Sequence, residues 1–185
     1  MSVIPERFRE LKLLVTEPVE YLVVRDFRWT TWARLTQAAT SLAGQTRFNG
    51  YIPYTVAQHS VLVSYMVAPH LALAGLLHDV GEMIIGDLVA PIRHLAGKEL
   101  IALEDWLLEQ VAEGEDFPCA HWAAVKSADR ELCRQETVAY FGELGWSLTR
   151  DQPVQGPTMP VWPAWPRDAA REAFIRRYTE LRGRL

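Results

Sequence analysis

Cysteine is scarce in this sequence, which has only Cys119 and Cys133, and the two do not form a Cys-x-x-Cys pair. Small secreted scaffolds held by disulfides have several cysteines, so we expect no disulfide framework and a reducing, cytoplasmic location. Positive charge is not in excess either, because 19 Lys and Arg stand against 23 Asp and Glu, which gives a net charge of -4. A nucleic-acid-binding surface needs a basic stripe, and we therefore expect no nucleic-acid partner.

Long hydrophobic runs are absent as well. The most apolar stretch, from Val61 to Leu77, is interrupted by Ser64, Pro69 and His70, whereas a membrane-spanning helix needs about 20 predominantly apolar residues in a row. The first residues do not join a basic segment to an apolar one, so no signal peptide is expected. We expect no membrane partner.

The rest of the composition is that of an ordinary globular protein. Of the 185 residues, 49% are hydrophobic and 23% are charged, and a chain of this length can bury a substantial core. Residues 1–185 are predicted to form a single domain, with a core at about 31–144 and a C-terminal extension at 145–185.

Apolar residues recur at spacings of three and four along most of the chain, which predicts helices. Thr55 is a suitable N-cap, and Gln58 is placed to complete a capping box with it. The short run Tyr21–Val24 has strand composition but stands alone. A proline-rich segment from Asp151 to Pro166 is predicted to wrap the surface before the last helix. The predicted class is all-α, with helices at about 31–42, 56–67, 70–84, 98–111, 121–144 and 167–181.

Four side chains that commonly bind metals lie among apolar neighbours in these predicted helices: His59, His78, Asp79 and Asp129. A single His on an apolar face is more often a core residue than a ligand, but an Asp in such surroundings is costly unless it is paired or bound to a metal. Two imidazoles and two carboxylates suit a divalent transition metal such as Co, Mn, Zn, Fe or Ni. Adjacent residues on a helix diverge by about 100°, so His78 and Asp79 can share an ion only if it lies between their two directions.

Two further carboxylates follow on the same segment. Glu82 lies four residues after His78 and three after Asp79, which places it on their face about one turn further along. Asp87 follows Gly86, where this helix is expected to end, so its carboxylate should project at the rim of the same site. Glu82 is positioned to hold an attacking water or a substrate oxygen.

Three segments together resemble the HD superfamily of metal-dependent phosphohydrolases: Val-Ala-Gln-His-Ser-Val at 56–61, Leu-Leu-His-Asp-x-x-Glu at 76–82, and Gly-Asp-Leu-x-x-Pro at 86–91. Within that superfamily the chain is most similar to the small bacterial and prophage 5′-deoxynucleotidases, over about residues 47–136. The resemblance implies an HD-type helical bundle that releases phosphate from 5′-(deoxy)nucleotides, above all deoxynucleoside 5′-monophosphates. If the chain is phage-encoded, its location would be the host cytoplasm.

Carried over position by position, the resemblance implies that the metal ligands are His59, His78, Asp79 and Asp129. It implies catalytic roles for Glu82 and Asp87 and a substrate-phosphate contact for Arg47, near which the sequence has no acidic residue. Phe48 occupies the place of a Trp that crowds the sugar 2′ position in some relatives. Arg93, just after Pro91, is a second candidate for the phosphate.

Two other functions remain open at this stage. One is a phage-type deoxynucleoside triphosphate phosphohydrolase acting on dATP or a similar substrate, which would need more cations near Arg47. The other is a non-catalytic nucleotide-sensing HD module. A homo-oligomer is also expected, because seven Trp are many for one small core and aromatic residues are enriched at interfaces.

Overall fold

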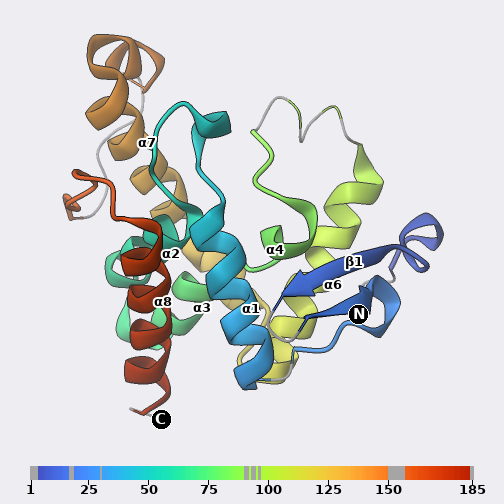
Figure 1. The fold of residues 1–185 in the computed structure, drawn as a ribbon. Coiled ribbons are helices and arrows are strands. Elements are labelled where there is room, and N and C mark those ends of the chain that lie inside the picture. The colour runs from blue at the N-terminus through green and yellow to red at the C-terminus, as the bar shows by residue number, and fades with distance from the viewer. Residues whose placement is uncertain are drawn as a thin grey trace.

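The structure, a computed structural model, describes residues 4–16, 19–29, 31–89, 92, 95, 97–149 and 157–183. Figure 1 shows a chain built mainly of helices, which confirms the predicted all-α class. Short 3-10 helices lie at Glu6–Phe8, Val24–Asp26, Phe48–Gly50 and Pro69–Leu71. The longer helical elements are α1 (Thr31–Gly44), α2 (Val56–Met66), α3 (Ala72–Leu77), α4 (Glu82–Ile85), α6 (Lys98–Glu115), α7 (Ala120–Thr149) and α8 (Arg167–Arg182).

One β-hairpin precedes the helices. Strand β1 (Lys12–Thr16) pairs antiparallel with β2 (Val19–Val23), so that Lys12 lies opposite Val23 and Thr16 opposite Val19. Most of the run with strand composition, Tyr21–Val23, is therefore part of the second strand of a hairpin, whereas Val24 begins a 3-10 helix. Its partner escaped the sequence analysis because Lys-Leu-Leu-Val-Thr does not alternate between apolar and polar residues.

Helix α2 lies in the interior, and every residue from Val56 to Ser64 is buried. Its N-terminus is capped as predicted, because the Thr55 hydroxyl accepts a hydrogen bond from the Gln58 backbone N–H at 3.2 Å. The other half of the predicted capping box is wrong. The Gln58 side chain instead accepts from the Trp165 N–H and donates to the Pro163 carbonyl, so α2 helps to fix the proline-rich segment.

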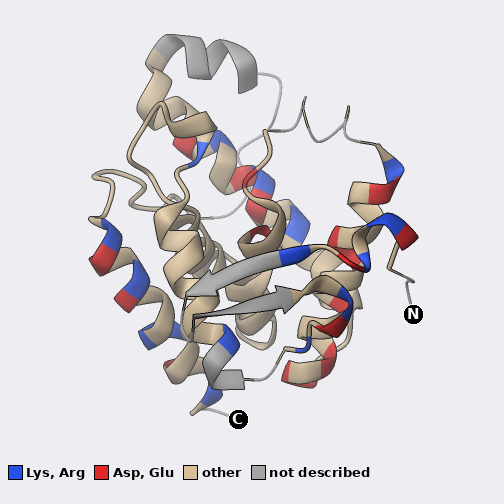
Figure 2. Cartoon of the chain, turned by 45° about the vertical axis from the view of Figure 1, so that its right-hand side comes forward, with Lys and Arg blue, Asp and Glu red and all other residues tan. Residues whose placement is uncertain are grey.

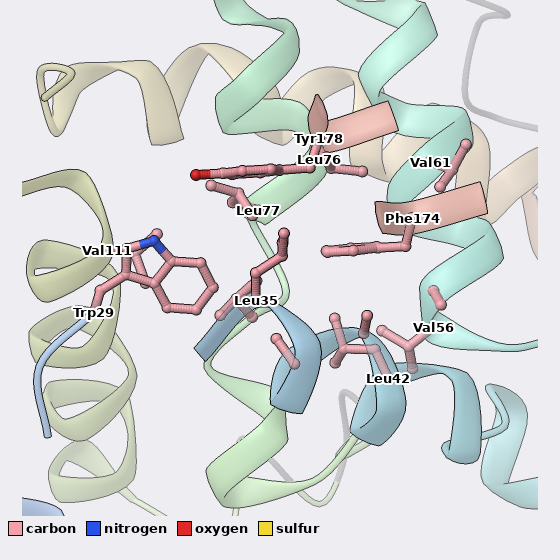
Figure 3. Close-up of a cluster of buried hydrophobic side chains, with 14 of the residues drawn as sticks. Trp29, Leu35, Leu42, Val56, Val61, Leu76, Leu77, Val111, Phe174 and Tyr178 are labelled. Carbon is pink, nitrogen blue, oxygen red and sulfur yellow. The ribbon is translucent and has the colours of Figure 1, made fainter. Parts of the chain in front are cut away.

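The main core lies between α1, α2, α3 and α8. Figure 3 shows Phe174 and Tyr178 of α8 reaching in beside Leu35 of α1 and Leu76 of α3. Phe174, Leu35 and Leu76 are fully buried. Although the sequence placed residues 167–181 in an extension, the last helix contributes to the same core as α1.

Residues 157–166 have no regular secondary structure, as expected from their prolines. They lie against α7, where Gln135 contacts the Pro157 carbonyl and the Met159 N–H, and the Tyr140 hydroxyl donates to the Val161 carbonyl at 3.0 Å. Residues 151–156 of the predicted wrapping segment lie outside the described residues.

Charged side chains of both signs are spread along the helices in Figure 2, including the one that leads to the C-terminus. That helix, α8, begins with Arg167 and Asp168 and continues with Arg171 and Glu172. Among the described residues, no helix combines the length and apolar character needed to cross a membrane.

Candidate metal centre

His59 lies in the first half of α2 and is completely buried. Its Nδ1 lies 2.6 Å from Glu136 Oε1, and a carboxylate accepts hydrogen bonds, so Nδ1 carries the proton. Its other ring nitrogen, Nε2, is buried and has no hydrogen-bond partner among the described residues. This tautomer leaves the Nε2 lone pair free to bind a metal.

His78, which follows the last residue of α3, repeats the arrangement. Its Nδ1 lies 2.9 Å from the Gly75 carbonyl oxygen, which can only accept, so this nitrogen is again the donor. Within the part of the chain that the structure describes, its Nε2 is also buried without a hydrogen-bond partner. The two rings lie with their centroids 5.3 Å apart.

Carboxylates from two other positions meet these nitrogens. Asp129 Oδ1 of α7 lies 3.3 Å from His59 Nε2 and 3.9 Å from His78 Nε2. Asp79 Oδ2 lies 3.8 Å from His59 Nε2 and 3.2 Å from His78 Nε2. Separations of this size suit ligand atoms that each lie about 2.0–2.2 Å from one ion.

His59, His78 and Asp129 form a group that could hold a metal, since their ligand atoms all lie within 4.8 Å of one another. This bears out the prediction that distant parts of the sequence meet at one centre. Asp79 is outside that group of three, although it contacts both histidines. Its role as a fourth ligand stays a prediction.

The backbone at His78 and Asp79 departs from the predicted continuous helix at 70–84. Helix α3 ends at Leu77 and α4 begins at Glu82, and hydrogen bonds between residues three apart join them, including Val80 N–H to Leu77 O. The tighter turn lets the adjacent side chains of His78 and Asp79 approach to 3.2 Å.

The partly buried carboxylates of Asp79 and Asp129 create a negative field at this centre. Burial opposes the shift, but the Asp79 and Asp129 carboxylates raise the pKa of His78 well above its usual value. In turn, and again against burial, His78 lowers the pKa of Asp79 to about 2. The pKa of Asp129 is likewise lowered, against burial, by its contacts with His59 and His78. Ionised carboxylates held out of water favour a positive charge between them, whether a proton or a metal ion.

Glu136 is a residue of this centre that the sequence analysis missed. It is completely buried on α7, and it accepts from both His59 Nδ1 at 2.6 Å and Arg47 Nε at 3.0 Å. Burial opposes its ionisation, but Arg47 and His59 lower its pKa. The available signal was its spacing, because Glu136 follows Asp129 by seven residues and shares its helix face two turns further along.

Arg47 therefore has an acidic partner, which corrects the interpretation of it as unpaired. Besides the bond to Glu136, its Nη1 lies 3.8 Å from Asp79 Oδ2, and only 12% of its side chain is exposed. Glu136 is 89 positions away in the chain, so local sequence could not reveal it. A contact from Arg47 to substrate stays a prediction, and it would have to use the terminal nitrogens of the guanidinium.

Glu82 and Asp87 lie on either side of the turn at Gly86. Glu82 Oε2 is buried and has no hydrogen-bond partner among the described residues. Burial, with the charges of Asp79 and Asp87, raises the pKa of Glu82 to about 10. Gln45, at the end of α1, fixes this turn by accepting from the Asp87 backbone N–H and donating to the Glu82 carbonyl.

The remaining predicted substrate residues are Phe48 and Arg93. Phe48 has a positive φ of 56°, which is unusual for a bulky residue, and its ring packs edge-on against Phe141 with centroids 5.3 Å apart. It lies beside the Arg47 guanidinium, 5.8 Å from the ring centre. Arg93 lies outside the described residues.

A cavity of about 560 Å³ opens beside the group that could hold a metal. Helices α6 and α7 and the segment around α4 form its walls, and its volume is in the range of sites for small organic ligands. Within the described chain, its lining includes neither Arg47 nor Phe48. The titratable side chains that line it are His78, Asp79, Glu82, Glu104, Asp105, Lys126, Asp129 and Arg130.

No protein-family model matches the chain. The uncharacterized protein RCAP_rcc00048 of Rhodobacter capsulatus is 34% identical over 122 residues, which cover 57% of this chain and 62% of that protein. The uncharacterized protein YfdR of Escherichia coli K12 is 33% identical over 93 residues, which cover 49% of this chain and 52% of that protein. The chain thus spans between half and two thirds of these relatives, and neither name states an activity.

Proposed function

We propose that this chain is a metal-dependent phosphohydrolase of the HD type that releases phosphate from 5′-nucleotides, in the first place deoxynucleoside 5′-monophosphates. The observation that supports it most is that the two histidines have the same hydrogen-bond arrangement. His59 and His78 each direct Nδ1–H to a protein acceptor and leave a buried Nε2 beside Asp129. Metal-binding histidines are oriented in this way by an acceptor at the second ring nitrogen.

The residues fit a divalent transition metal. His59, His78 and Asp129 would hold it, with Asp79 as a fourth ligand, and the mixed nitrogen and oxygen donors suit Co, Mn, Zn, Fe or Ni. When bound, such an ion supplies Lewis-acid polarisation of a phosphoryl oxygen and of the attacking water. A centre buried on one side and open to a cavity on the other leaves room for substrate.

The surrounding side chains would perform the proton transfers. Glu82 has a buried oxygen beside the centre with no hydrogen-bond partner among the described residues, and it would orient the water. The charge of a bound ion would lower the raised pKa of Glu82, so that this carboxylate could accept the water's proton. Asp87 would protonate the leaving 5′-oxygen. Arg47 would neutralise charge on the non-bridging phosphoryl oxygens through its terminal nitrogens, while Glu136 holds its Nε.

The test combines metal analysis with a screen for phosphate release over nucleoside mono-, di- and triphosphates. We expect about one divalent ion per chain, and chelation should abolish the release of inorganic phosphate from monophosphates. Asp129→Asn should lose the ion, whereas Asp168→Asn, an exposed change at the start of α8, should behave as wild type.

Each other outcome contradicts part of the proposal. If metal-supplied protein contains no ion, the centre is not a metal site. If the loaded protein binds nucleotides but releases nothing, the chain is a sensing module. Release of triphosphate from deoxynucleoside triphosphates alone would assign it to the triphosphohydrolases.

A further inference from the structure

One face of α7 presents three chemically different side chains to the cavity. Trp122, Lys126 and Asp129 all line it and are spaced by four and three residues, so they share one face of the helix. At 1.5 Å of rise per residue, Trp122 lies about 10 Å from Asp129 along the helix axis, with Lys126 between them. The order along the cavity wall is thus aromatic ring, cation and metal-binding carboxylate.

Trp122 has an unsatisfied donor. Its indole Nε1–H is buried and has no hydrogen-bond partner among the described residues. The ring is held from one side by Phe117, at a centroid distance of 4.9 Å and an interplanar angle of 75°. Buried indole N–H groups normally find an acceptor. Trp122 lines the cavity, so a turn of its ring would bring this N–H to an acceptor on a ligand there.

Lys126 places a cation beside the metal-binding end. Its ammonium nitrogen lies 3.7 Å from Asp129 Oδ2, and 53% of its side chain is exposed. Arg130, one residue after Asp129, adds a second cation to the same wall, whereas the α6 side of the cavity contains Glu104 and Asp105. Once a metal ion offsets the negative charge of the carboxylates at the centre, a phosphate in the cavity is drawn to α7, near Asp129.

We propose that this face of α7 selects the substrate by its length and by the chemical groups at its two ends. Lys126 binds oxygens of the phosphate under attack, and the Trp122 N–H donates to an acceptor on a planar ring about one sugar away from that phosphate. The substrate class is a phosphate ester of a ring-bearing sugar, such as a nucleoside 5′-monophosphate lying along α7. This inference rests on the proposed function and adds the residues that select the substrate.

The test uses the metal-loaded full chain and compares deoxyadenosine 5′-monophosphate with 2-deoxyribose 5-phosphate, which has a hydroxyl in place of the base. Wild type should prefer the nucleotide in kcat/KM. Trp122→Phe keeps an aromatic ring but removes the donor, and it should reduce that preference by roughly three- to tenfold, the value of one neutral hydrogen bond. Lys126→Gln should raise KM for both substrates alike.

Two residues outside the cavity provide matched control variants. Trp162→Phe changes a tryptophan that is 68% exposed, and Lys98→Gln changes a lysine at the start of α6. Neither residue lines the cavity, and both variants should keep the wild-type preference. An unchanged preference in Trp122→Phe, or a wild-type protein indifferent to the ring, overturns the inference.

A separate measurement keeps this test independent of catalysis. If no phosphate ester is hydrolysed, the proposed function fails, but binding of deoxyadenosine 5′-monophosphate to the metal-loaded protein can still be followed by calorimetry. Binding that weakens in Trp122→Phe and in Lys126→Gln, but not in the two controls, supports the inference. The absence of binding, or equal binding by all five proteins, overturns it.

Discussion

Glu136 Oε1 accepts a hydrogen bond from His59 Nδ1 at 2.6 Å, with both side chains completely excluded from solvent. The bond fixes the tautomer of His59 and turns its Nε2 toward Asp129. The same carboxylate accepts from Arg47 on its second oxygen. One buried group thus orients both a candidate metal ligand and the cation next to it.

Replacing that carboxylate tests its role directly. Glu136→Gln keeps the shape but removes the charge, and we expect it to weaken metal affinity by about 10- to 100-fold, as is usual for the partner of a ligating histidine. Competition against a chromophoric chelator measures the effect. Glu131→Gln is the matched control, because Glu131 is also buried on α7 but pairs with Arg134. Unchanged affinity in Glu136→Gln would mean that His59 needs no such support.

Asp79 offers a test of the fourth ligand position. Asp79→Asn preserves size and removes the charge that contacts both histidines. If Asp79 is a ligand, metal affinity should fall by more than about 100-fold, beyond the loss typical of a residue that only supports a ligand. The reference is Asp129→Asn, assayed in the same way. Full metal retention by Asp79→Asn would leave a three-residue protein ligand set.

Replacing Glu82, in contrast to Asp79, should affect turnover and not metal binding. Glu82→Gln should retain the metal and the fold but lose turnover by about 10²-fold or more, the usual contribution of a positioned acid or base. Phosphate release and metal content are measured on the same preparation. Glu172→Gln, an exposed change on α8, provides the comparison. A Glu82→Gln protein with wild-type turnover would show that another group handles the water.

Residue type and periodicity were sufficient to predict the all-α class. The meeting of His59, His78 and Asp129 at one centre was an expectation implied by the resemblance that their motifs carry. The sequence could not reveal the break between α3 and α4, since apolar spacings of three and four fit a continuous helix equally well. Nor could it reveal the bond of Glu136 to Arg47, which joins residues 89 positions apart. Such pairings arise from tertiary packing, and no local pattern encodes them.

The place of α8 in the core yields a prediction about stability. Phe174 is completely buried between α1, α2 and α3 (Figure 3), so Phe174→Ala should reduce the free energy of unfolding by about 3–5 kcal/mol. Urea denaturation measures the change. Arg176→Ala, at an exposed position two residues on, should change it by less than about 0.5 kcal/mol. Similar effects of the two variants would show that α8 adds little to the core.

Arg47→Lys tests whether the guanidinium acts on substrate or only supports the site. Lysine keeps the charge but lacks the planar fork that holds Glu136 through Nε while leaving the terminal nitrogens for a phosphate. The side chain is largely buried and bonded to a fully buried carboxylate, so the free energy of unfolding should fall by about 1–2 kcal/mol. The rate of nucleotide hydrolysis should fall by much more than this loss of stability explains. It should also fall by more than the rate of p-nitrophenyl phosphate hydrolysis. Thermal melts and kinetics on both substrates separate the two effects. If the variant is destabilised but hydrolyses nucleotides at the wild-type rate, the role of Arg47 is to support Glu136 and His59 alone.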